Sequence, residues 1–462
     1  MEEAKYLAAV IGAGPAGLFA SRYLSNHGVR VALFNRDVKP GGLAEYGIYP
    51  DKIKMKEGLR KQFQEILSSE SVDYFGNIKV SSGGNLMLSD LTSAGFQAIV
   101  VATGAQGTKW LRLPGEQLPG VYHAKDLVFH YNQLPPFSER RFLIGSKVIL
   151  VGAGNVMMDL AHYLVRAKRV DEVRVVMRRG PAEIKFTKKE LENVAANIDF
   201  PALDQEIDRV SNSMLAAGQN IEAYRQAFHD GLLKALPKES PTRIYFEFLA
   251  SPVRILGDWT MGISSLKVED NTLTLVDGKV KARGTGITRQ IDGDTVIFAI
   301  GDTVDKDFSL PIFGDAYCVN EKPSYPVNGI SYEAYDIDAA SPVKSVFLAG
   351  WARQASTGLV GVARKDGETA AQAVLQYLGT LPVGAGNDHH FQQFSAWLNR
   401  NFPAVVRKAD LARLQAAEKE EMQLRGLEDF KFSTNETMFQ KMGFNGAAQD
   451  ERQGESLTAV ME

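Results

Sequence analysis

Cysteine is almost absent from this sequence of 462 residues, which contains only Cys318. A disulphide reductase needs two thiols close together, and an iron–sulfur cluster is normally held by four cysteine ligands. The chain can therefore carry neither a redox-active thiol pair nor a cluster of its own. We expect Cys318 itself to be a buried small hydrophobic residue.

Long apolar runs and a strong net charge are missing as well. The longest apolar stretches, such as Val148–Val151 and Val296–Ile300, have the length of strands and fall far short of the roughly 20 residues that span a bilayer. A net charge of -3 gives no sign of binding to nucleic acid or to an anionic membrane. Residues 1–5 lack the features of a secretory signal, so we expect a cytoplasmic protein.

Glycine, by contrast, is plentiful, with 42 residues, and two glycine-rich turns recur in the same setting. In each case an apolar strand precedes the turn, a helix follows it, and a second strand comes next. Such a repeat predicts an α/β protein with two Rossmann-like dinucleotide-binding folds. The expected elements are Tyr6–Ile11, Ala16–Asn26 and Val29–Phe34 around the first turn, and Lys147–Val151, Val156–Ala167 and Glu172–Met177 around the second.

The rest of the chain fits the same fold class. Further hydrophobic strands that end at glycine suit parallel sheets, whose ligands lie at the carboxyl ends of the strands. Residues 266–292 alternate like short antiparallel strands with Asp-Gly turns. The polar segment from Gly443 onward is expected to be mobile. The additional elements are strands at Phe96–Thr103, Thr295–Ile300 and Ser345–Ala349, Asp-Gly turns at 277–278 and 292–293, and helices at Phe391–Leu398 and Lys408–Gly426.

The first turn, Gly12-Ala13-Gly14-Pro15-Ala16-Gly17, has the spacing that binds a dinucleotide. Gly12 permits the tight turn, Gly14 lets the backbone approach a pyrophosphate at the helix end, and Gly17 lets helix and strand pack closely. The second strand of such a fold usually ends in an acid that binds ribose, and Asn35 stands there instead. We expect Asn35 to contact the ribose, and Asn35→Asp to leave binding intact or tighter.

The second turn, Gly152-Ala153-Gly154-Asn155-Val156-Met157, lacks the third glycine. Its following strand ends in Arg178-Arg179, where an NAD site would more usually offer an acid. Two forked guanidinium groups suit the 2′-phosphate of NADP(H), and FAD has no such phosphate. The first turn is therefore predicted to bind FAD and the second NADP(H).

A third segment, Gly350–Gly361, precedes an expected helix that runs to about Leu378. Backbone amides near Gly358, Leu359 and Val360 lie at the positive end of that helix and could stabilise negative charge on a reduced flavin. Trp351 follows a strand-ending glycine, Gly350, and could shield the flavin or nicotinamide ring. Ordinary core packing explains Trp351 equally well.

In these segments the chain resembles the adrenodoxin-reductase-type ferredoxin–NADP+ reductases over about residues 5–375, and more distantly the small subunit of glutamate synthase. The resemblance implies a split FAD domain, 1–106 and 335–384, an inserted NADP domain, 107–334, and a mainly helical C-terminal extension, 385–462. The segments that carry it are Gly12–Gly17, Gly41-Gly42-Leu43, Ala102-Thr103-Gly104, Gly154-Asn155-Val156, Arg178-Arg179-Gly180-Pro181, Phe186-Thr187 and Gly350-Trp351 with Thr357-Gly358.

The resemblance also implies roles for single residues. Gly42, Leu43, Thr103 and Gly104 would line the FAD site, and Trp351 with Gly358–Val360 would face the flavin. Gly154, Asn155 and Val156 would hold the NADP pyrophosphate, whereas Arg178, Arg179 and Glu190 would hold the 2′-phosphate end. Lys52 follows Asp51 where the family commonly has a histidine near the flavin, so Lys52 must act differently there. No metal is expected.

The predicted activity is hydride transfer between NADP(H) and FAD and single-electron transfer between FAD and a ferredoxin-type iron–sulfur protein or flavodoxin. Alternatives are an NADPH-oxidising subunit of a larger complex and a nucleotide-binding protein without significant turnover. Ferredoxins are usually acidic, so a basic face would speed their docking. Two basic clusters offer such a face: Lys52, Lys54, Lys56, Arg60 and Lys61; and Arg166, Lys168, Arg169, Arg174, Lys185, Lys188 and Lys189.

The acidic run Glu418–Glu421 in the extension suggests two roles, covering such a face or engaging another partner. No counterpart of the extension is apparent in the resembling family, and this favours the complex slightly.

Overall fold

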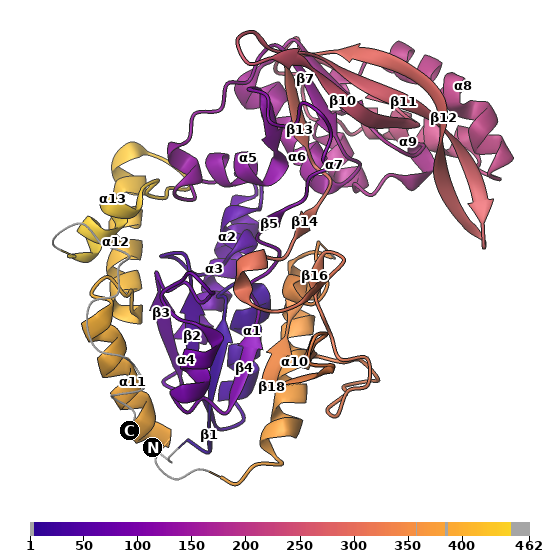
Figure 1. Ribbon diagram of the computed structural model, residues 1–462. Coiled ribbons are helices and arrows are strands. Elements are labelled where there is room, and N and C mark those ends of the chain that lie inside the picture. The colour runs from indigo at the N-terminus through magenta and orange to yellow at the C-terminus, as the bar shows by residue number, and fades with distance from the viewer. Residues whose placement is uncertain (1–3, 357, 384–386, 445–462) are drawn as a thin grey trace. The chain divides into compact units, whose positions relative to one another are not determined.

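The computed structural model describes residues 4–356, 358–383 and 387–444. Thr357 lies outside the described residues. So does the segment beyond Phe444, which is most of the polar stretch for which mobility is expected. The chain divides into two compact units (Figure 1). Unit 1 is formed by Met1–Thr108, Phe129–Glu139 and Asp302–Glu462, and unit 2 by Lys109–Val128 and Arg140–Gly301. Residues 302–334, which we grouped with the NADP domain, are part of unit 1.

Unit 1 is built on a six-stranded sheet with the order β17-β18-β4-β1-β2-β3. All its strands are parallel except β17. Ile11 at the end of β1 pairs with Phe34 of β2 and Val101 of β4, so the carboxyl ends of these strands share one edge. The strands are β1 (Tyr6–Ile11), β2 (Val29–Asn35), β3 (Val72–Gly76), β4 (Ala98–Val101), β17 (Glu333–Asp336) and β18 (Ser341–Leu348).

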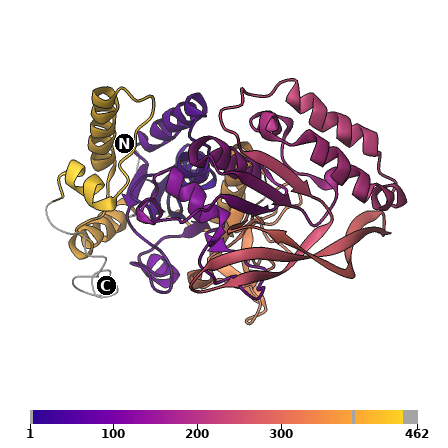
Figure 2. The same cartoon turned by 90° about the horizontal axis from the view of Figure 1, so that it is seen from above.

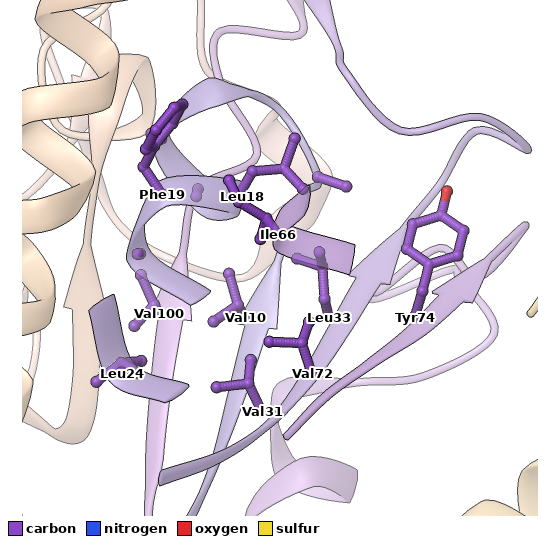
Figure 3. Packing of buried hydrophobic residues seen from close by; sticks show 14 of the residues in the cluster. Val10, Leu18, Phe19, Leu24, Val31, Leu33, Ile66, Val72, Tyr74 and Val100 are labelled. Carbon is purple, nitrogen blue, oxygen red and sulfur yellow. The ribbon is translucent and has the colours of Figure 1, made fainter. Parts of the chain in front are cut away.

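Consecutive residues of a strand point to opposite faces of the sheet. Both sets of side chains are buried here, so the sheet has a hydrophobic core on each face. Figure 3 shows Val10, Val31 and Val100 on the face that packs against Leu18 and Phe19. The helices that contribute to this core cluster are α1 (Pro15–Ser25), α3 (Ile53–Leu67), α10 (Val360–Leu378), α12 (Lys408–Arg425) and α13 (Asn435–Met442).

The other face of the sheet packs against the helix α11 (Asn387–Asn401) of the C-terminal extension and against α4 (Leu88–Ser93). Trp397 of α11 is fully buried there, and Phe394 lies edge-on to Phe34 and Phe96. In Figure 1 the helices of the extension run alongside the sheet of unit 1. The extension is therefore part of the core of unit 1.

Unit 2 combines a five-stranded parallel sheet, with the order β6-β13-β7-β8-β9, and a three-stranded antiparallel sheet, β10-β11-β12. One face of the parallel sheet packs on the antiparallel sheet through Val151, Phe298, Leu266 and Val268. Figure 2 shows both sheets from above. The strands are β6 (Val121–His123), β7 (Lys147–Val151), β8 (Glu172–Val176), β9 (Arg243–Glu247), β10 (Ala250–Asp258), β11 (Gly262–Val276), β12 (Lys279–Asp292) and β13 (Thr295–Phe298).

The helices of unit 2 include α6 (Asn155–Tyr163), α7 (Lys188–Glu192), α8 (Phe200–Ala216) and α9 (Ile221–Leu232). Of these, α6 packs on β7 and α8 packs on β9. The helix α5 (Ala124–Tyr131) begins in unit 2 and ends in unit 1. Across the described ranges, no helix is both long enough and apolar enough to cross a membrane.

The predicted α/β class with two Rossmann-like folds is confirmed, and β1 has the predicted bounds. The expected meander at 266–292 is wrong in detail. Instead of several short strands, β11 and β12 are 15 and 14 residues long and meet at the turn Asp277-Gly278. The pair Asp292-Gly293 makes no hairpin, because β13 follows and pairs with β7 in the parallel sheet.

Candidate nucleotide-binding sites

The first glycine turn has the shape that its sequence predicts. Gly12 has φ +105°, and a Cβ there would lie 2.4 Å from the carbonyl oxygen of Ala102. A Cβ on Gly17 would lie 1.9 Å from the carbonyl oxygen of Gly12, so helix and strand approach too closely for any side chain. A Cβ on Gly14, at the N-terminus of α1, would meet nothing within 4 Å. Gly14 thus faces open space where a pyrophosphate would approach the helix end.

The turn at Gly350 and the middle of α10 lie against the same glycine turn. A Cβ on Gly350, which has φ +64°, would lie 2.7 Å from the Cβ of Ala16, and one on Gly367 of α10 would lie 2.1 Å from the carbonyl oxygen of Ala16. Small residues thus let α1 and the segment around α10 pack closely at Ala16. The structure brings together the predicted phosphate-binding turn and the predicted flavin-facing turn.

Two further predicted segments border this turn. The amide of Gly41 donates to the carbonyl of Ala13 at 2.7 Å, and a Cβ on Gly42 would lie 3.1 Å from the Cα of Gly14. Leu43 begins the helix α2 (Leu43–Tyr46). On the other side, Thr103 and Gly104 follow β4, and Gly104 has φ +70°. These four residues therefore lie on segments next to the first turn, and their contact with FAD stays a prediction.

The predicted ribose contact, Asn35, is buried and engaged inside the protein. Its Oδ1 accepts from the amide of Ala13 at 3.2 Å, and its Nδ2 lies 2.8 Å and 2.9 Å from the carbonyl oxygens of Asp37 and Lys39. Nδ2 also lies 3.2 Å from the hydroxyl of Tyr74. The amide of Asn35 thus holds the glycine turn against the end of β2, and its contact with a ribose stays a prediction.

A cavity of about 410 Å³ opens beyond the carboxyl ends of β2 and β3. Ligand pockets for small molecules typically have this size. The first glycine turn belongs to the same sheet edge, where ligands of such folds bind. Its lining includes Arg36, Val38, Tyr46, Asn77 and Phe137.

The turn at Gly350-Trp351 is anchored by a residue that the sequence analysis missed. Asp366 of α10 accepts from the amide of Gly350 at 2.6 Å and forms a buried ion pair with Arg353. Arg353 also lies over the ring of Tyr332, 4.6 Å from its centroid. An acid in the second turn of a helix that follows a glycine-rich segment is the signal that could have pointed to Asp366.

The predicted flavin-facing residues lie between this anchor and α10. Trp351 is half-buried in a short 3-10 turn, and Gly358 has φ +76°. Leu359 is 67% exposed, and α10 begins at Val360, inside the segment Gly350–Gly361 that was expected to precede the helix. Lys52 caps α3, where its amide donates to the carbonyl of Tyr49. The catalytic roles of Trp351, Gly358 and Lys52 stay predictions.

The first basic cluster lies only partly at the surface. Lys56 is 1% exposed, and its Nζ donates to Asn132 at 3.1 Å. Arg60 forms ion pairs at 2.7 Å with Glu45 of α2 and with Asp429 of the extension. Lys54 and Lys61 are exposed, so docking of a partner at this cluster stays a prediction.

Both suggested roles of the acidic run stay predictions, because in the described part of the chain its ion pairs are with Lys39, Arg425 and Lys441, outside the two basic clusters. Glu418 is buried and pairs with Lys39 at 2.5 Å. Lys431 nearby donates to the carbonyl of Glu45 at 3.1 Å. Burial, reinforced by the charges of Lys56 and other cations, lowers the pKa of Lys431 to about 7, although Glu45 opposes this shift. Burial alone would raise the pKa of Glu45, but Lys39, Arg60 and Lys431 hold that pKa well below its usual range.

The second glycine turn repeats the geometry of the first. Gly152 has φ +151°, and a Cβ there would lie 2.3 Å from the carbonyl oxygen of Ala299. A Cβ on Gly154, at the N-terminus of α6, would meet nothing within 4 Å. Asn155 accepts from the amide of Thr187 at 2.9 Å, and Val156 is exposed. The structure thus presents a second open helix end with the predicted residues around it.

Arg178 and Arg179 follow β8 without an acidic partner. Across the residues that the structure describes, no carboxylate oxygen lies within 4.0 Å of either guanidinium group. Arg174 on the same strand, by contrast, pairs with Glu247 at 2.7 Å. Two unpaired guanidinium groups side by side repel each other and favour an anion such as a phosphate. Glu190 accepts from Asn193 at 3.2 Å on its own helix, and its contact with a nucleotide stays a prediction.

The second basic cluster is also partly neutralised. Arg166 pairs with Glu239 at 2.6 Å, Arg174 pairs with Glu172 and Glu247, and Lys189 lies 3.6 Å from Glu192. Two of these acids, Glu239 and Glu247, come from distant segments, whereas Glu172 and Glu192 lie within three residues of their partners. The docking hypothesis therefore loses much of the positive charge on which it depended.

Known proteins share this arrangement. The chain is 28% identical over 437 residues to NADPH-ferredoxin reductase FprA of Mycobacterium leprae, which covers 87% of this chain and 90% of that protein. It is 27% identical to the human mitochondrial NADPH:adrenodoxin oxidoreductase, over 81% of this chain and 80% of that protein. The chain is a homologue of these reductases. The resemblance inferred from its motifs is thereby confirmed.

The structural comparison supports the same homology at the level of the fold. The structure of Mycobacterium tuberculosis FprA in complex with NADPH is similar with a TM-score of 0.78 and 24% identity, over 95% of this chain and 99% of that chain. Such coverage includes most of the C-terminal extension, so the expectation that the extension lacks a counterpart is wrong. It is part of the shared fold.

A family model described as pyridine nucleotide-disulphide oxidoreductase matches residues 6–199. This range contains both glycine turns and Arg178-Arg179. Cys318 is the one cysteine in the sequence, so the match concerns the nucleotide-binding scaffold and not a pair of thiols.

Proposed function

We propose that this protein is an FAD-dependent oxidoreductase that takes hydride from NADPH and passes single electrons to a ferredoxin-type iron–sulfur protein or a flavodoxin. Unit 1 would bind FAD and unit 2 would bind NADP(H). The names of the homologues, NADPH-ferredoxin reductase and NADPH:adrenodoxin oxidoreductase, support this activity and this class of acceptor.

One observation carries the proposal: two open helix ends of the same shape, only one of which has unpaired arginines at the end of the following strand. Gly14 and Gly154 both face open space at a helix N-terminus. Arg178 and Arg179 mark the second site alone for a 2′-phosphate. The two sites therefore suit two different dinucleotides.

A bound flavin supplies the redox chemistry, because it accepts a hydride and can release its electrons one at a time. The protein supplies binding and orientation. The α1 end faces the pyrophosphate, Asp366 fixes the turn that carries Trp351, and the α10 amides would stabilise negative charge. No side-chain nucleophile is required for this activity.

The alternative of an electron-transfer subunit relied on an extension with no assigned role. The extension instead fills the core of unit 1, as the burial of Trp397 and Glu418 shows. That alternative has lost its main support. We also propose a cytoplasmic location, although the adrenodoxin-type homologues are mitochondrial by name. Fractionation of cells that express the tagged protein would test it.

The proposal is tested first by the cofactor and then by its reductant. The purified protein should be yellow and release one FAD per chain on denaturation, and NADPH should reduce it better than NADH. The double variant Arg178→Ala, Arg179→Ala should bind NADPH far more weakly, since each charge-assisted phosphate contact contributes about 10- to 150-fold in affinity.

Binding of NADH should hardly change in that variant. Arg283→Ala, at an exposed position in the same unit, is the matched control and should leave both cofactors unaffected. A colourless protein that does not take up FAD, or a wild type that prefers NADH, would contradict the proposal.

A further inference from the structure

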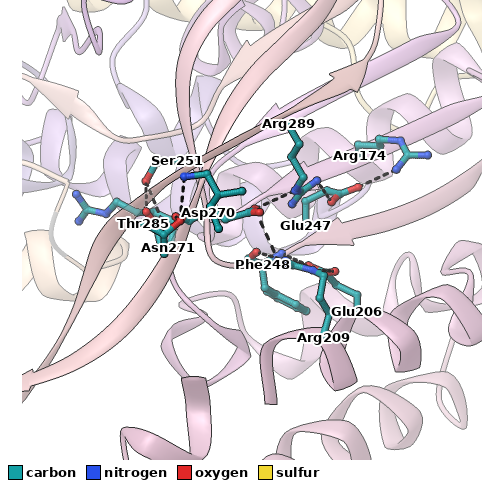
Figure 4. Close-up of polar contacts among 12 residues, drawn as sticks. Arg174, Glu206, Arg209, Glu247, Phe248, Ser251, Asp270, Asn271, Thr285 and Arg289 are labelled. Carbon is teal, nitrogen blue, oxygen red and sulfur yellow. Dashed lines mark hydrogen bonds and ion pairs between the residues drawn. The ribbon is translucent and has the colours of Figure 1, made fainter. Parts of the chain in front are cut away.

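The backbone at Arg178 is held by a residue far away in the sequence, Asn271 on β11. Its Nδ2 donates to the carbonyl oxygen of Arg178 at 2.9 Å and to Oγ of Ser251 at 2.8 Å. Asn271 is 8% exposed, so these bonds form away from solvent. Figure 4 shows Asn271 and Ser251 side by side at one end of a polar network.

The strand pairing is irregular beside Asn271. Glu269 pairs with Thr288 and Asn271 pairs with Gly284, so Asp270 of β11 faces residues 285–287 of β12. The extra residues therefore form a bulge in β12, opposite the residue that precedes Asn271.

The corner between β9 and β10 holds the same backbone from another side. The amide of Leu249 donates to the carbonyl of Arg179 at 3.3 Å, and that of Ala250 donates to Met177 at 2.9 Å. Leu249 is buried with φ +49°, a conformation that costs energy for a residue with a side chain. The amide of Asn271 donates to the carbonyl of Leu249 at 2.7 Å and so supports this strained residue.

Arginines and acids further along the network fix the corner itself. Arg289 pairs with Glu247 at 2.8 Å and with Asp270 at 2.9 Å, as Figure 4 shows. The backbone of Phe248 accepts from Arg209 at 2.7 Å and donates to Glu206 at 2.6 Å. The acids of this network are thus engaged with arginines other than Arg178 and Arg179, which keeps those two available for an anion.

We propose that Asn271 is a positioning residue that sets the selectivity for a nucleotide with a 2′-phosphate. This inference rests on the proposed function, in which Arg178 and Arg179 bind that phosphate. The side chain of Arg178 is exposed, so nothing but its backbone fixes where the guanidinium group can reach. Sites of this kind lose affinity when a supporting contact is lost and the binding group moves by a fraction of an ångström.

The test measures binding of two small probes to the full-length protein by calorimetry: adenosine 2′,5′-bisphosphate, which carries the 2′-phosphate, and 5′-AMP, which does not. Asn271→Ala should lower the preference for the bisphosphate about tenfold, less than the loss of a whole phosphate contact. The Kd for 5′-AMP should stay nearly constant. Ser251→Ala removes only the partner of Asn271 and should shift the preference in the same direction by a smaller factor.

Arg225→Gln is the control, because Arg225 pairs with Asp204 and Asp208 of α8, outside the contacts that hold residues 177–179. It should lower the stability of the protein without changing the preference. An unchanged preference in Asn271→Ala, or an equal fall in Arg225→Gln, would overturn the inference. If Asn271→Ala does not fold, Ser251→Ala decides between the same outcomes. A wild type without preference would instead refute the proposed NADPH site, and the inference with it.

Discussion

Asn35 shows, at the scale of one residue, that a position in a motif does not by itself establish what the side chain contacts. Asn35 stands where an acid usually binds ribose. From the motif alone, Asn35→Asp would therefore restore the usual ribose contact. In the structure both protons of its amide are used, and two of its partners are backbone carbonyls. A carboxylate has no proton to donate to them.

Asn35→Asp should therefore destabilise the protein by about 1–3 kcal/mol, because buried carbonyl groups are left without a donor beside a negative charge. FAD should also bind more weakly, since the carbonyl oxygens of Asp37 and Lys39 repel the carboxylate that would have to hold Ala13 of the glycine turn in place. Chemical denaturation and FAD titration measure the two effects. Unchanged stability together with equal or tighter FAD binding would favour the simpler view taken from the motif.

Lys56 and Lys54 show that two lysines close together in the sequence can differ in whether their charge lies at the surface. They stand two residues apart in one helix, yet Lys56 is buried against Asn132 and Lys54 is exposed. Burial lowers the pKa of Lys56, although Asp429 and Glu45 oppose the shift.

Lys56→Glu should unfold the protein at a much lower denaturant concentration, because it places a negative charge next to Asp429 and Glu45 in a buried site. Lys54→Glu, the matched control on the same helix, should change the free energy of unfolding by no more than about 0.5 kcal/mol. Denaturation curves of the two variants under one buffer decide the matter. Equal effects would mean that Lys56 lies at the surface.

At the scale of elements, the C-terminal helices hold the segment that follows the first glycine turn. Lys431, Asp429 and Glu418 of the extension reach Glu45, Arg60 and Lys39, which lie on or near α2. Gly42 and Leu43 at the start of α2 are predicted to contact FAD. The extension therefore fixes one wall of the proposed flavin site.

Lys431 makes this contact sensitive to pH. Its pKa falls from the ordinary value of 10.5 to about 7 on folding, chiefly through burial. Between these two values the unfolded chain holds a proton that the folded chain has released, so the free energy of unfolding should rise with pH. Below about pH 7 both states hold the proton and this contribution is constant.

Denaturant unfolding at pH 7, 8 and 9 should show that slope in the wild type and a smaller one in Lys431→Met. Lys54→Met keeps the buried cluster of Lys39, Glu45, Lys56, Arg60, Glu418, Asp429 and Lys431 intact and should keep the slope. If Lys431→Met and Lys54→Met have the same dependence on pH, the buried lysine does not titrate in this range.

Across the whole molecule, local patterns in the sequence predicted local features of the structure, such as turns and the bounds of a strand. The glycine turns and the strand Tyr6–Ile11 follow from spacing and hydrophobic runs. The pairing of Arg60 with Asp429 and of Asn271 with Arg178 joins residues far apart in the chain. No local pattern encodes such pairs, so the sequence could not predict that Arg60 is paired or that the extension packs into the core of unit 1.

The most direct test of the proposed function follows both half-reactions by anaerobic stopped-flow absorbance. NADPH mixed with the purified protein should bleach the flavin band faster than NADH does, and an oxidised ferredoxin mixed next should restore the band as it becomes reduced. Bleaching by NADPH without recovery on ferredoxin would refute the acceptor. No bleaching by either nucleotide would contradict the account of two cooperating dinucleotide sites.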